Sequence, residues 1–442
     1  MKQDKSATSP LPDFVASTVR WGISQRLPRT VLQLGALRGD PLARIALEPQ
    51  RADRMALYAG LRRRGAVVLR PGLGAVVGHA AANTVLRSDQ FGVGGGHGEL
   101  PSRAVRLLGR VTRDQARGPL DPPSMLAVDP PLHSRYRRLV SQAFTPRHVA
   151  ALEERVTKTA AQLLDSLEGD GARRFDLVER FASQLPVAVI GDLLGVRPAD
   201  RRDLLRWGDA AALFLDPGLT WRQYHTAERG VTALAEWFTG HVRRLRADPG
   251  DDLLSRLALL DGDDALDEVE LRAVGLLVLG AGFETTVGLI SNAVALFDGH
   301  PAQLDAVRAD PGLWANAVDE VLRFDSPVQL TLRVAYEDTA VDGVRVPRGR
   351  PLLVLLAAAN RDPAVFDDPH RFDVTRANAA DHIAFSSGVH YCLGAGLARL
   401  EARVALRQLY ERFPDLGIAG PPRRRRTRVL RGFARLPVAV GG

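Results

Sequence analysis

The arrangement of apolar and polar residues predicts that helices dominate this chain. Residues 133–247 and 251–324 are mostly apolar at helical spacing, with breaks at proline and glycine. Residues 66–77 and 327–356 instead hold short apolar runs around Pro-Gly, Asp-Gly and Arg-Gly pairs, which predict strands. A last helix is expected to begin after Cys392. We therefore expect a mainly α fold with a small β region, of the α+β class.

No linker or internal repeat divides the chain. Residues 1–41 are punctuated by proline and follow no clear pattern, so we expect a partly disordered N-terminal segment there. Residues 42–442 are expected to form a single large helical domain. The composition, with 45% hydrophobic and 25% charged residues, is that of an ordinary globular protein.

Composition and charge exclude several classes of function. Lysine occurs only at Lys2, Lys5 and Lys158, so no Gly-Lys pair exists and the phosphate-binding loop of P-loop nucleotidases is excluded. The net charge is +8, but acidic residues are interspersed throughout, and no nucleic-acid partner is predicted. Glycine-rich residues 92–98 do not match the dinucleotide-binding pattern G-x-G-x-x-G.

The sequence also indicates where the protein functions. The first 14 residues have no apolar stretch of the signal-peptide type. The longest apolar run, residues 273–283, is shorter than the about 18 residues expected of a spanning helix. The single cysteine, Cys392, excludes an intramolecular disulfide. We expect a soluble cytoplasmic protein with no membrane anchor.

A long helix is predicted over residues 267–298. About 30 residues without proline would give a helix some 45 Å long. Asp267 and Glu270 have the spacing of a capping box at its start. Residues 273–283 are apolar on every side, which is typical of a helix that crosses the centre of a core.

Polar residues interrupt this apolar stretch at Ala281-Gly282-Phe283-Glu284-Thr285-Thr286. Burial of an unpaired carboxylate costs several kcal/mol, so Glu284 requires either a partner or a use. One interpretation is a pair with an arginine elsewhere in the core. We favour the other, in which Ala281 and Gly282 open a groove for a small ligand while Glu284 and Thr285 deliver protons to it.

Glycines surround the single thiol in residues 385–401. Gly388 and Gly394 allow the backbone to approach a flat ligand, and the helix that opens near Leu393 directs its amides at the sulfur. This environment is expected to favour the thiolate. The thiolate could act as a nucleophile with His390, as a metal ligand or as the axial ligand of haem iron, and spacing alone does not decide among these.

Two further patterns are weak by themselves. Glu320 and Arg323 stand three residues apart on one helix face, as many solvated pairs do. His133 and Arg137 stand four apart on a proline-initiated helix, and together they could bind an anion.

Taken together, residues 129–401 resemble the cytochrome P-450 haem-thiolate monooxygenases, of the soluble, actinobacterial-like type. The matching motifs are the haem-binding loop Phe385-x-x-Gly388-x-His390-x-Cys392-x-Gly394, the oxygen-activation motif Ala281-Gly282-x-Glu284-Thr285 and the ion pair Glu320-x-x-Arg323. Arg371 would complete a charge triad with this pair. One departure is Ser386, where the family more often has glycine, and we expect a small adjustment of the loop.

The resemblance implies haem b, iron protoporphyrin IX, as the cofactor. Cys392 would be the iron ligand, with Phe385 beside the sulfur. The family binds the haem propionates at positions that match His133, Arg137, Arg333 and His390. The resemblance also places Ala281 and Gly394 at the haem, and Glu284 and Thr285 in a proton relay.

The activity implied is insertion of one atom of O2 into a C-H or C=C bond of a lipophilic small molecule. Electrons would come from a ferredoxin and an NAD(P)H-driven ferredoxin reductase, because the chain has no fused reductase region. Arg135 and Arg138 are candidates for docking the ferredoxin. Residues 92–98 resemble the family's mobile loop, and residues 213–215 are candidates to line the pocket.

Two alternatives remain open. One is a peroxide-driven haem peroxygenase, which would not need the proton relay. The other is a haem-binding sensor without turnover.

Overall fold

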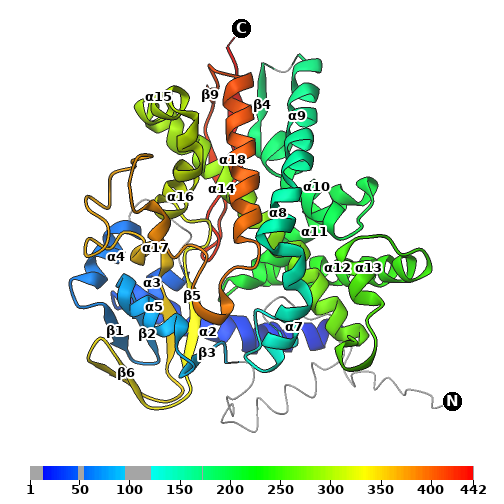
Figure 1. Cartoon of the computed structure of the whole chain (residues 1–442). Helices are drawn as coiled ribbons and strands as arrows, with labels where there is room; N and C mark the ends of the chain where they lie inside the picture. The colour runs from blue at the N-terminus through cyan, green and yellow to red at the C-terminus, as the bar shows by residue number, and fades with distance from the viewer. Residues whose placement is uncertain (1–12, 48–53, 95–120, 172, 442) are drawn as a thin grey trace, which may run out of the picture.

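The computed structural model of this protein describes residues 13–47, 54–94, 121–171 and 173–441. Helices form most of the molecule, and the strands of the main sheet lie together on one side of them (Figure 1). The expected fold class, mainly α with a small β region, is confirmed.

The main sheet has five strands in the order β1-β2-β8-β5-β3. These strands are β1 (Val67–Arg70), β2 (Leu73–Val76), β3 (Phe91–Gly92), β5 (Thr331–Ala335) and β8 (Pro351–Val354). β1 and β2 form the hairpin predicted over residues 66–77, and β2 pairs in parallel with β8. The remaining pairs of this sheet are antiparallel.

Helix α14 (Glu268–Gly299) is the longest among the described residues and follows the prediction over 267–298 closely. The capping box is present, because Asp267 accepts from the Glu270 amide at 2.7 Å while Glu270 accepts from the Asp267 amide at 3.1 Å. By length and composition α14 could cross a membrane, but 61% of its most apolar window is buried inside the molecule. It is therefore the central helix of the core.

Aromatic packing fixes the C-terminal half of α14. The Phe297 ring is edge-on to Trp314, Phe372 and Tyr410, with centroid separations of 5.7, 5.9 and 5.8 Å. Each such pair contributes about 0.5–1.5 kcal/mol beyond the area that it buries. Trp314 belongs to α16 (Trp314–Phe324) and Tyr410 to α18 (Ala395–Arg412), so these contacts join three helices.

The other helices surround this core. They are α3 (Pro41–Leu47), α4 (Arg54–Arg62), α5 (His79–Arg87), α7 (Leu132–Ser141), α8 (Pro146–Ala151), α9 (Glu153–Gly169), α10 (Gln184–Leu193), α11 (Arg201–Ala212), α12 (Trp221–Ala247), α13 (Leu253–Ala258), α15 (Pro301–Ala309) and α17 (Leu356–Ala359). The sequence patterns predict α7 and α18 within a few residues.

Three small sheets complete the fold. In the first, β12 (Pro437–Ala439) lies between β4 (Arg174–Asp176) and β9 (Gly417–Ile418) and pairs with both. The other two sheets are the pairs β6 (Thr339–Val341) with β7 (Val344–Val346) and β10 (Arg423–Arg424) with β11 (Phe433–Arg435). The strands beyond residue 412 are not indicated by the sequence analysis, because each has only two or three residues.

Residues 13–37 form one continuous helical stretch. It consists of α1 (Asp13–Trp21), the π-helical turn η1 (Gly22–Arg26) and α2 (Leu27–Leu37). The sequence analysis does not indicate these helices. Residues 1–12 of the expected N-terminal segment lie outside the described residues.

Candidate functional site

The chain around Cys392 forms a tight turn before α18. The Cys392 amide donates to the Phe385 carbonyl at 2.9 Å and closes the turn. Gly388 has φ +69°, and a Cβ there would lie 2.2 Å from the Leu86 carbonyl oxygen. Ser386 has φ +62°, so this serine adopts the left-handed conformation that favours glycine, at a cost of about 1–2 kcal/mol. The expected adjustment is thus local strain at Ser386.

The protein alone does not favour the thiolate. Burial raises the pKa of the Cys392 thiol, and the Gly394 amide and two nearby guanidiniums only partly oppose this. The expectation of a thiolate produced by the loop itself is therefore wrong. Coordination to a metal ion would deprotonate the thiol outright, so the half-buried sulfur is suited to a ligand role.

Phe385 lies against a polar support that the sequence analysis missed. The Arg399 guanidinium lies 4.6 Å from the centroid of the Phe385 ring. Arg399 Nε donates to Asp319 Oδ1 at 2.7 Å, and His382 Nε2 lies 3.2 Å from the same oxygen. Arg399 lies in the second turn of α18, shortly after the cysteine, and this spacing is the sequence signal for its position.

The four predicted anion-binding side chains come together from three parts of the chain. The rings of His133, on α7, and His390 are 4.3 Å apart. Arg137, one turn further along α7, donates to the Tyr391 carbonyl at 2.6 Å. Arg333, on β5, is buried and donates to the Leu332 carbonyl at 2.8 Å.

Asp129 organises this cluster, although the sequence analysis gave it no role. Its carboxylate accepts from the Tyr336 hydroxyl and, at 3.2 Å, from the Val93 amide. Burial opposes ionisation, but the pKa of Asp129 is lowered because His390 and these donors stabilise the charge. His390 Nε2 lies 3.6 Å from the carboxylate, close enough for charge attraction but beyond hydrogen-bond distance, and this buried nitrogen makes no hydrogen bond.

The cluster thus has an excess of donors. Burial, followed by repulsion from His390 and Arg137, lowers the pKa of His133 to about 4. The Asp129 carboxylate faces the four basic side chains of the cluster, and the ring nitrogen Nε2 of His390 has no acceptor within hydrogen-bond distance. An anionic group such as a haem propionate fits this donor set.

One stripe of α14 is accessible although the helix lies in the core. Ala281 is exposed, and Leu277 and Thr285, four residues to either side, are half-buried. A Cβ on Gly280 would meet nothing within 4 Å, and the same holds for Gly394 at the start of α18. These positions indicate a hollow that could accept a flat group such as a porphyrin. The Thr285 hydroxyl donates to the Ala281 carbonyl at 3.1 Å.

Glu284 is buried and paired. Its Oε1 lies 2.6 Å from Arg425 Nη1, and Arg425 also pairs with Asp209 of α11. Burial raises the pKa of Glu284 to about 7, with Arg425 lowering it and Asp209 raising it. The core pairing that we considered less favoured is therefore present. Arg425 is shielded by this contact, whereas Arg423 and Arg426 are exposed.

Glu320 and Arg323 form a fully buried pair. Arg323 Nε and Nη2 donate to the two Glu320 oxygens at 2.6 and 2.8 Å. The third member is Arg376, whose Nε is 3.3 Å from Glu320 Oε2. The prediction of Arg371 is wrong, because its exposed side chain pairs with Asp373 and only its carbonyl accepts from Arg323.

The two arginines proposed for ferredoxin docking are engaged within the chain. Arg135 pairs with Glu270 at 2.8 Å and Arg138 with Asp264 at 2.5 Å. Of the predicted pocket segments, 213–215 forms the short helix η5 (Leu213–Leu215), whose residues are half-buried. Residues 95–98 of the predicted loop lie outside the described residues.

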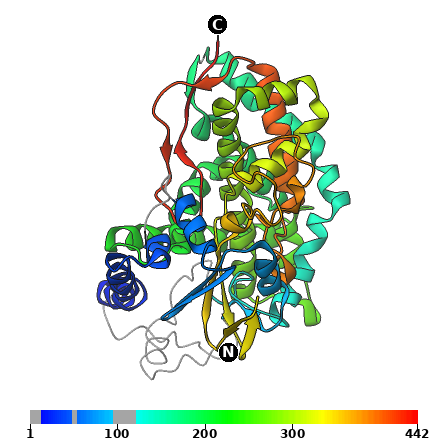
Figure 2. The same ribbon diagram turned by 90° about the vertical axis from the view of Figure 1, so that its left-hand side faces the viewer.

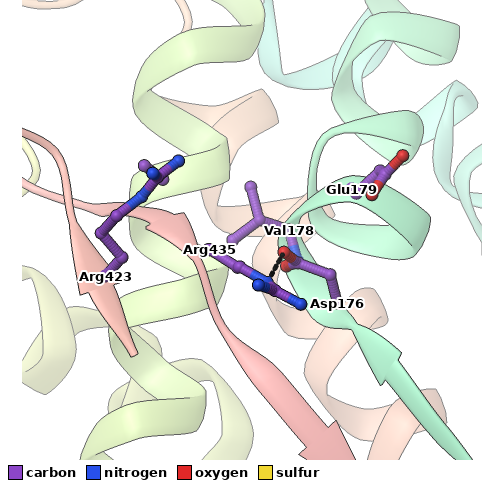
Figure 3. A pocket seen from close by; sticks show the side chains of 6 residues that line it. Asp176, Val178, Glu179, Arg423 and Arg435 are labelled. Carbon is purple, nitrogen blue, oxygen red and sulfur yellow. Dashed lines mark hydrogen bonds and ion pairs between the residues drawn. The ribbon is translucent and has the colours of Figure 1, made fainter. Parts of the chain in front are cut away.

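A second hollow lies between β4 and β11. Its lining includes Arg435 and Asp176, whose Nε and Oδ2 are 3.4 Å apart (Figure 3).

Within the described ranges no cluster of three or more His, Cys, Asp or Glu side chains is suited to holding a metal ion. The Cys392 thiol would thus be a single protein ligand, which is enough for a metal ion whose other ligands belong to a prosthetic group such as a porphyrin.

Comparisons with known proteins agree with this geometry. The sequence profile of the cytochrome P450 family matches residues 313–416. A putative cytochrome P450 140 from Mycobacterium tuberculosis is 47% identical over 429 residues, which cover 96% of this chain and 97% of that protein.

Two further relatives extend the comparison. The 6-deoxyerythronolide B hydroxylase of Saccharopolyspora erythraea is 43% identical over 72% of this chain and 78% of its own length. The crystal structure of myxobacterial cytochrome P450 CYP267B1 in complex with myristic acid matches with a TM-score of 0.79 and 34% identity, over 89% of this chain and 97% of that chain. The chain described here therefore belongs to the cytochrome P450 family and is a haem-dependent monooxygenase.

Proposed function

We propose that this cytochrome P450 inserts one atom of O2 into a C-H or C=C bond of a lipophilic small molecule, with electrons from a ferredoxin and an NAD(P)H-driven ferredoxin reductase. The observation that carries the proposal is the buried Glu284 beside the accessible stripe of α14. Its pKa of about 7 suits a group that both accepts and releases protons near neutral pH.

The residues around Cys392 would hold haem b. Cys392 would ligate the iron, with Phe385 packed beside the sulfur. His133, Arg137, Arg333 and His390 would receive the propionates, with the arginines well suited to paired hydrogen bonds with carboxylates. Ala281 and Gly394 leave space for the ring. When bound, the haem supplies the oxygen chemistry, to which the thiolate ligand contributes electron density.

Glu284 and Thr285 would control protons at the accessible stripe of α14. Asp209 is half-exposed, whereas Glu284 is buried, and Arg425 contacts both carboxylates. The Arg425 guanidinium thus links a carboxylate at the molecular surface, Asp209, with a carboxylate in the interior, Glu284. The Thr285 hydroxyl would donate a hydrogen bond to a ligand beside α14, since this hydroxyl can turn away from the Ala281 carbonyl to which it donates in the structure.

A lipophilic substrate is supported by the apolar surroundings and by the relatives. Leu277 on α14 and residues of η5 (Leu213–Leu215) are half-buried apolar groups. One relative hydroxylates 6-deoxyerythronolide B, and another binds myristic acid. We propose a substrate of this apolar character, and a location in the cytoplasm, where a ferredoxin is available.

The ferredoxin would dock near the thiol. Val389 and Tyr391, on either side of His390, are 53% and 41% exposed. Arg135 and Arg138 are less suited than expected, because docking would compete with their own ion pairs.

The test is turnover by the haem-loaded protein with ferredoxin, ferredoxin reductase, NADPH and O2. A substrate is first chosen by the shift that it causes in the haem spin-state spectrum. Thr285→Ala should retain haem and oxygen consumption, while product per NADPH falls about tenfold or more and hydrogen peroxide rises.

Thr286→Ala is the matched control, because the Thr286 hydroxyl also donates to a helix carbonyl, that of Gly282 at 3.4 Å, but its side chain is buried. This variant should remain coupled. Full coupling in Thr285→Ala would remove this threonine from the mechanism. Product formation with peroxide alone, and none with the electron donors, would replace the proposal by a peroxygenase.

A further inference from the structure

The helical stretch of residues 13–37 presents a row of large apolar side chains outward, while polar side chains on its inner face bond to the rest of the protein. The outward side chains are all at least 39% exposed, and the most exposed are Leu37 at 85% and Phe14 at 69%. The complete set is Phe14, Val15, Val19, Ile23, Leu27, Val31, Leu34 and Leu37. We call this set the apolar stripe.

Hydrogen bonds hold the polar side against α12 and the chain before it. Ser17 Oγ and Arg20 Nη2 donate to Glu228 at 2.6 and 2.9 Å. Trp21 Nε1 donates to the Leu219 carbonyl at 2.9 Å. Arg29 Nη1 donates to the Gly218 carbonyl at 2.7 Å. These bonds fix the helix axis, so the apolar stripe is held outward. Figure 2 shows the dark-blue helices at the margin of the molecule beside the green segment.

The π-helical turn aligns the apolar stripe. From Val15 to Val31 its members recur every four residues, and in an α-helix each such step exceeds a full turn by about 40°. A stripe at this spacing would therefore wind around the helix. Within η1 (Gly22–Arg26) the turn is wider, so four residues fall short of a full turn and offset part of this drift. The two halves of the apolar stripe consequently face one side.

We propose that the apolar stripe docks on an anionic lipid surface. The sequence from Phe14 to Arg38 contains four arginines and no acidic residue. Arg26 and Arg38 are exposed at the rim of the apolar stripe, and the Arg26 guanidinium lies 5.5 Å from the Trp21 ring. Apolar side chains flanked by arginine are characteristic of helices that lie in the plane of a membrane surface.

Charge favours lipid over a second copy of this chain. In a symmetric dimer the same arginines would face one another across the interface, which is unfavourable. An anionic bilayer instead attracts each of them. Attachment would also bring the chain that enters α12 to the lipid surface, since residues 218 and 219 are bonded to the same helices.

The experiment measures sedimentation of the haem-loaded protein with vesicles. Phosphatidylcholine vesicles are compared with equimolar phosphatidylcholine and phosphatidylglycerol. The intact protein should bind the anionic vesicles more tightly, and added salt should weaken this binding. The triple variant Leu27→Gln, Val31→Gln and Leu34→Gln should bind about tenfold or more weakly. Glutamine maintains helix propensity, so the fold should be preserved.

Two further variants complete the design. Leu259→Gln removes an apolar side chain that is 55% exposed outside the apolar stripe, and it should bind like the intact protein. Arg26→Gln with Arg38→Gln should weaken binding to the anionic vesicles by about fivefold per arginine, with little change on phosphatidylcholine.

Equal sedimentation of the intact protein and the triple variant would overturn the proposal. So would an intact protein that is dimeric by analytical ultracentrifugation and becomes monomeric in the triple variant, because a second copy would then cover the apolar stripe. An unchanged melting temperature and an unchanged ferrous carbon monoxide spectrum establish that the variants are folded. The inference does not depend on the proposed substrate or electron donor.

Discussion

The buried carboxylates of Glu320 and Glu284 both pair with arginine, and they differ in how completely they are bonded. Glu320 accepts from Arg323, from Arg376 and, at 2.9 Å, from the Asp373 amide. Glu284 instead has Arg425, which Asp209 shares.

The two arginines also differ in the partners of their remaining guanidinium N–H groups. Arg323 gives them to the carbonyls of residues 360, 369 and 371 at 3.0–3.1 Å, so its network is saturated. Arg425 divides its charge between a buried and a half-exposed carboxylate. A saturated buried pair holds segments together, whereas a shared arginine leaves a carboxylate able to change its protonation state.

The largest effect is expected for Glu320→Ala. This change leaves Arg323 buried without its carboxylate, which should lower the free energy of unfolding by about 3–5 kcal/mol. Urea denaturation and the yield of haem-loaded protein measure the effect. Glu284→Ala should cost less, because Arg425 keeps Asp209 as a partner. A smaller loss for Glu320→Ala than for Glu284→Ala would break the comparison.

Glu284→Gln should flatten the pH dependence of stability. The pKa of Glu284 is raised to about 7 in the folded protein, so its stabilising contribution is full below the unfolded value near 4.5 and is lost as the pH rises through 7. The contribution of Glu284 to the free energy of unfolding should fall by about 3 kcal/mol over this pH range. Urea denaturation at pH 5 and pH 8 should show this loss in the intact protein and not in the variant. An identical pH dependence in both would contradict the raised pKa.

Arg425→Gln should move the pH profile of turnover. Arg425 lowers the pKa of Glu284, so its removal should shift the limb that reports Glu284 to higher pH by about one unit or more. The rate of product formation against pH measures the shift. Arg426→Gln, one residue along the chain, is the control and should leave the profile in place.

The smallest effect is expected for Asp209→Asn. Asp209 raises the pKa of Glu284, so the same limb should move to lower pH, in the opposite direction to Arg425→Gln. Because Asp209 is half-exposed, the shift should be about half a unit or less and should shrink in high salt. A shift in the same direction for both variants would show that Arg425 does not connect the two carboxylates.

The sequence predicts those features that depend on neighbours along the chain. The capping box of Asp267 and Glu270, the hairpin over residues 66–77 and the turn around Cys392 all follow from local spacing. So does the pairing of Glu320 with Arg323, three residues away. In each case the partner lies within a few residues, so one helix turn or one hairpin brings it into contact.

Partners that are distant in sequence are not predictable in this way. Arg425 reaches Glu284 across 141 positions, and Tyr336 reaches Asp129 across 207. The choice of Arg376 over Arg371 depends on how the chain between them turns. The helix over residues 13–37 was missed for another reason: its exposed apolar residues recur every four positions, and a π-helical turn interrupts the α-helical period.

The Asp129 carboxylate joins two segments that are far apart in sequence, because it accepts a hydrogen bond from the amide of Val93, 36 positions earlier. The ends of the intervening stretch are thereby fixed at one place beside the basic cluster. A change at either Val93 or Asp129 should therefore be felt at the basic side chains around His133 and His390.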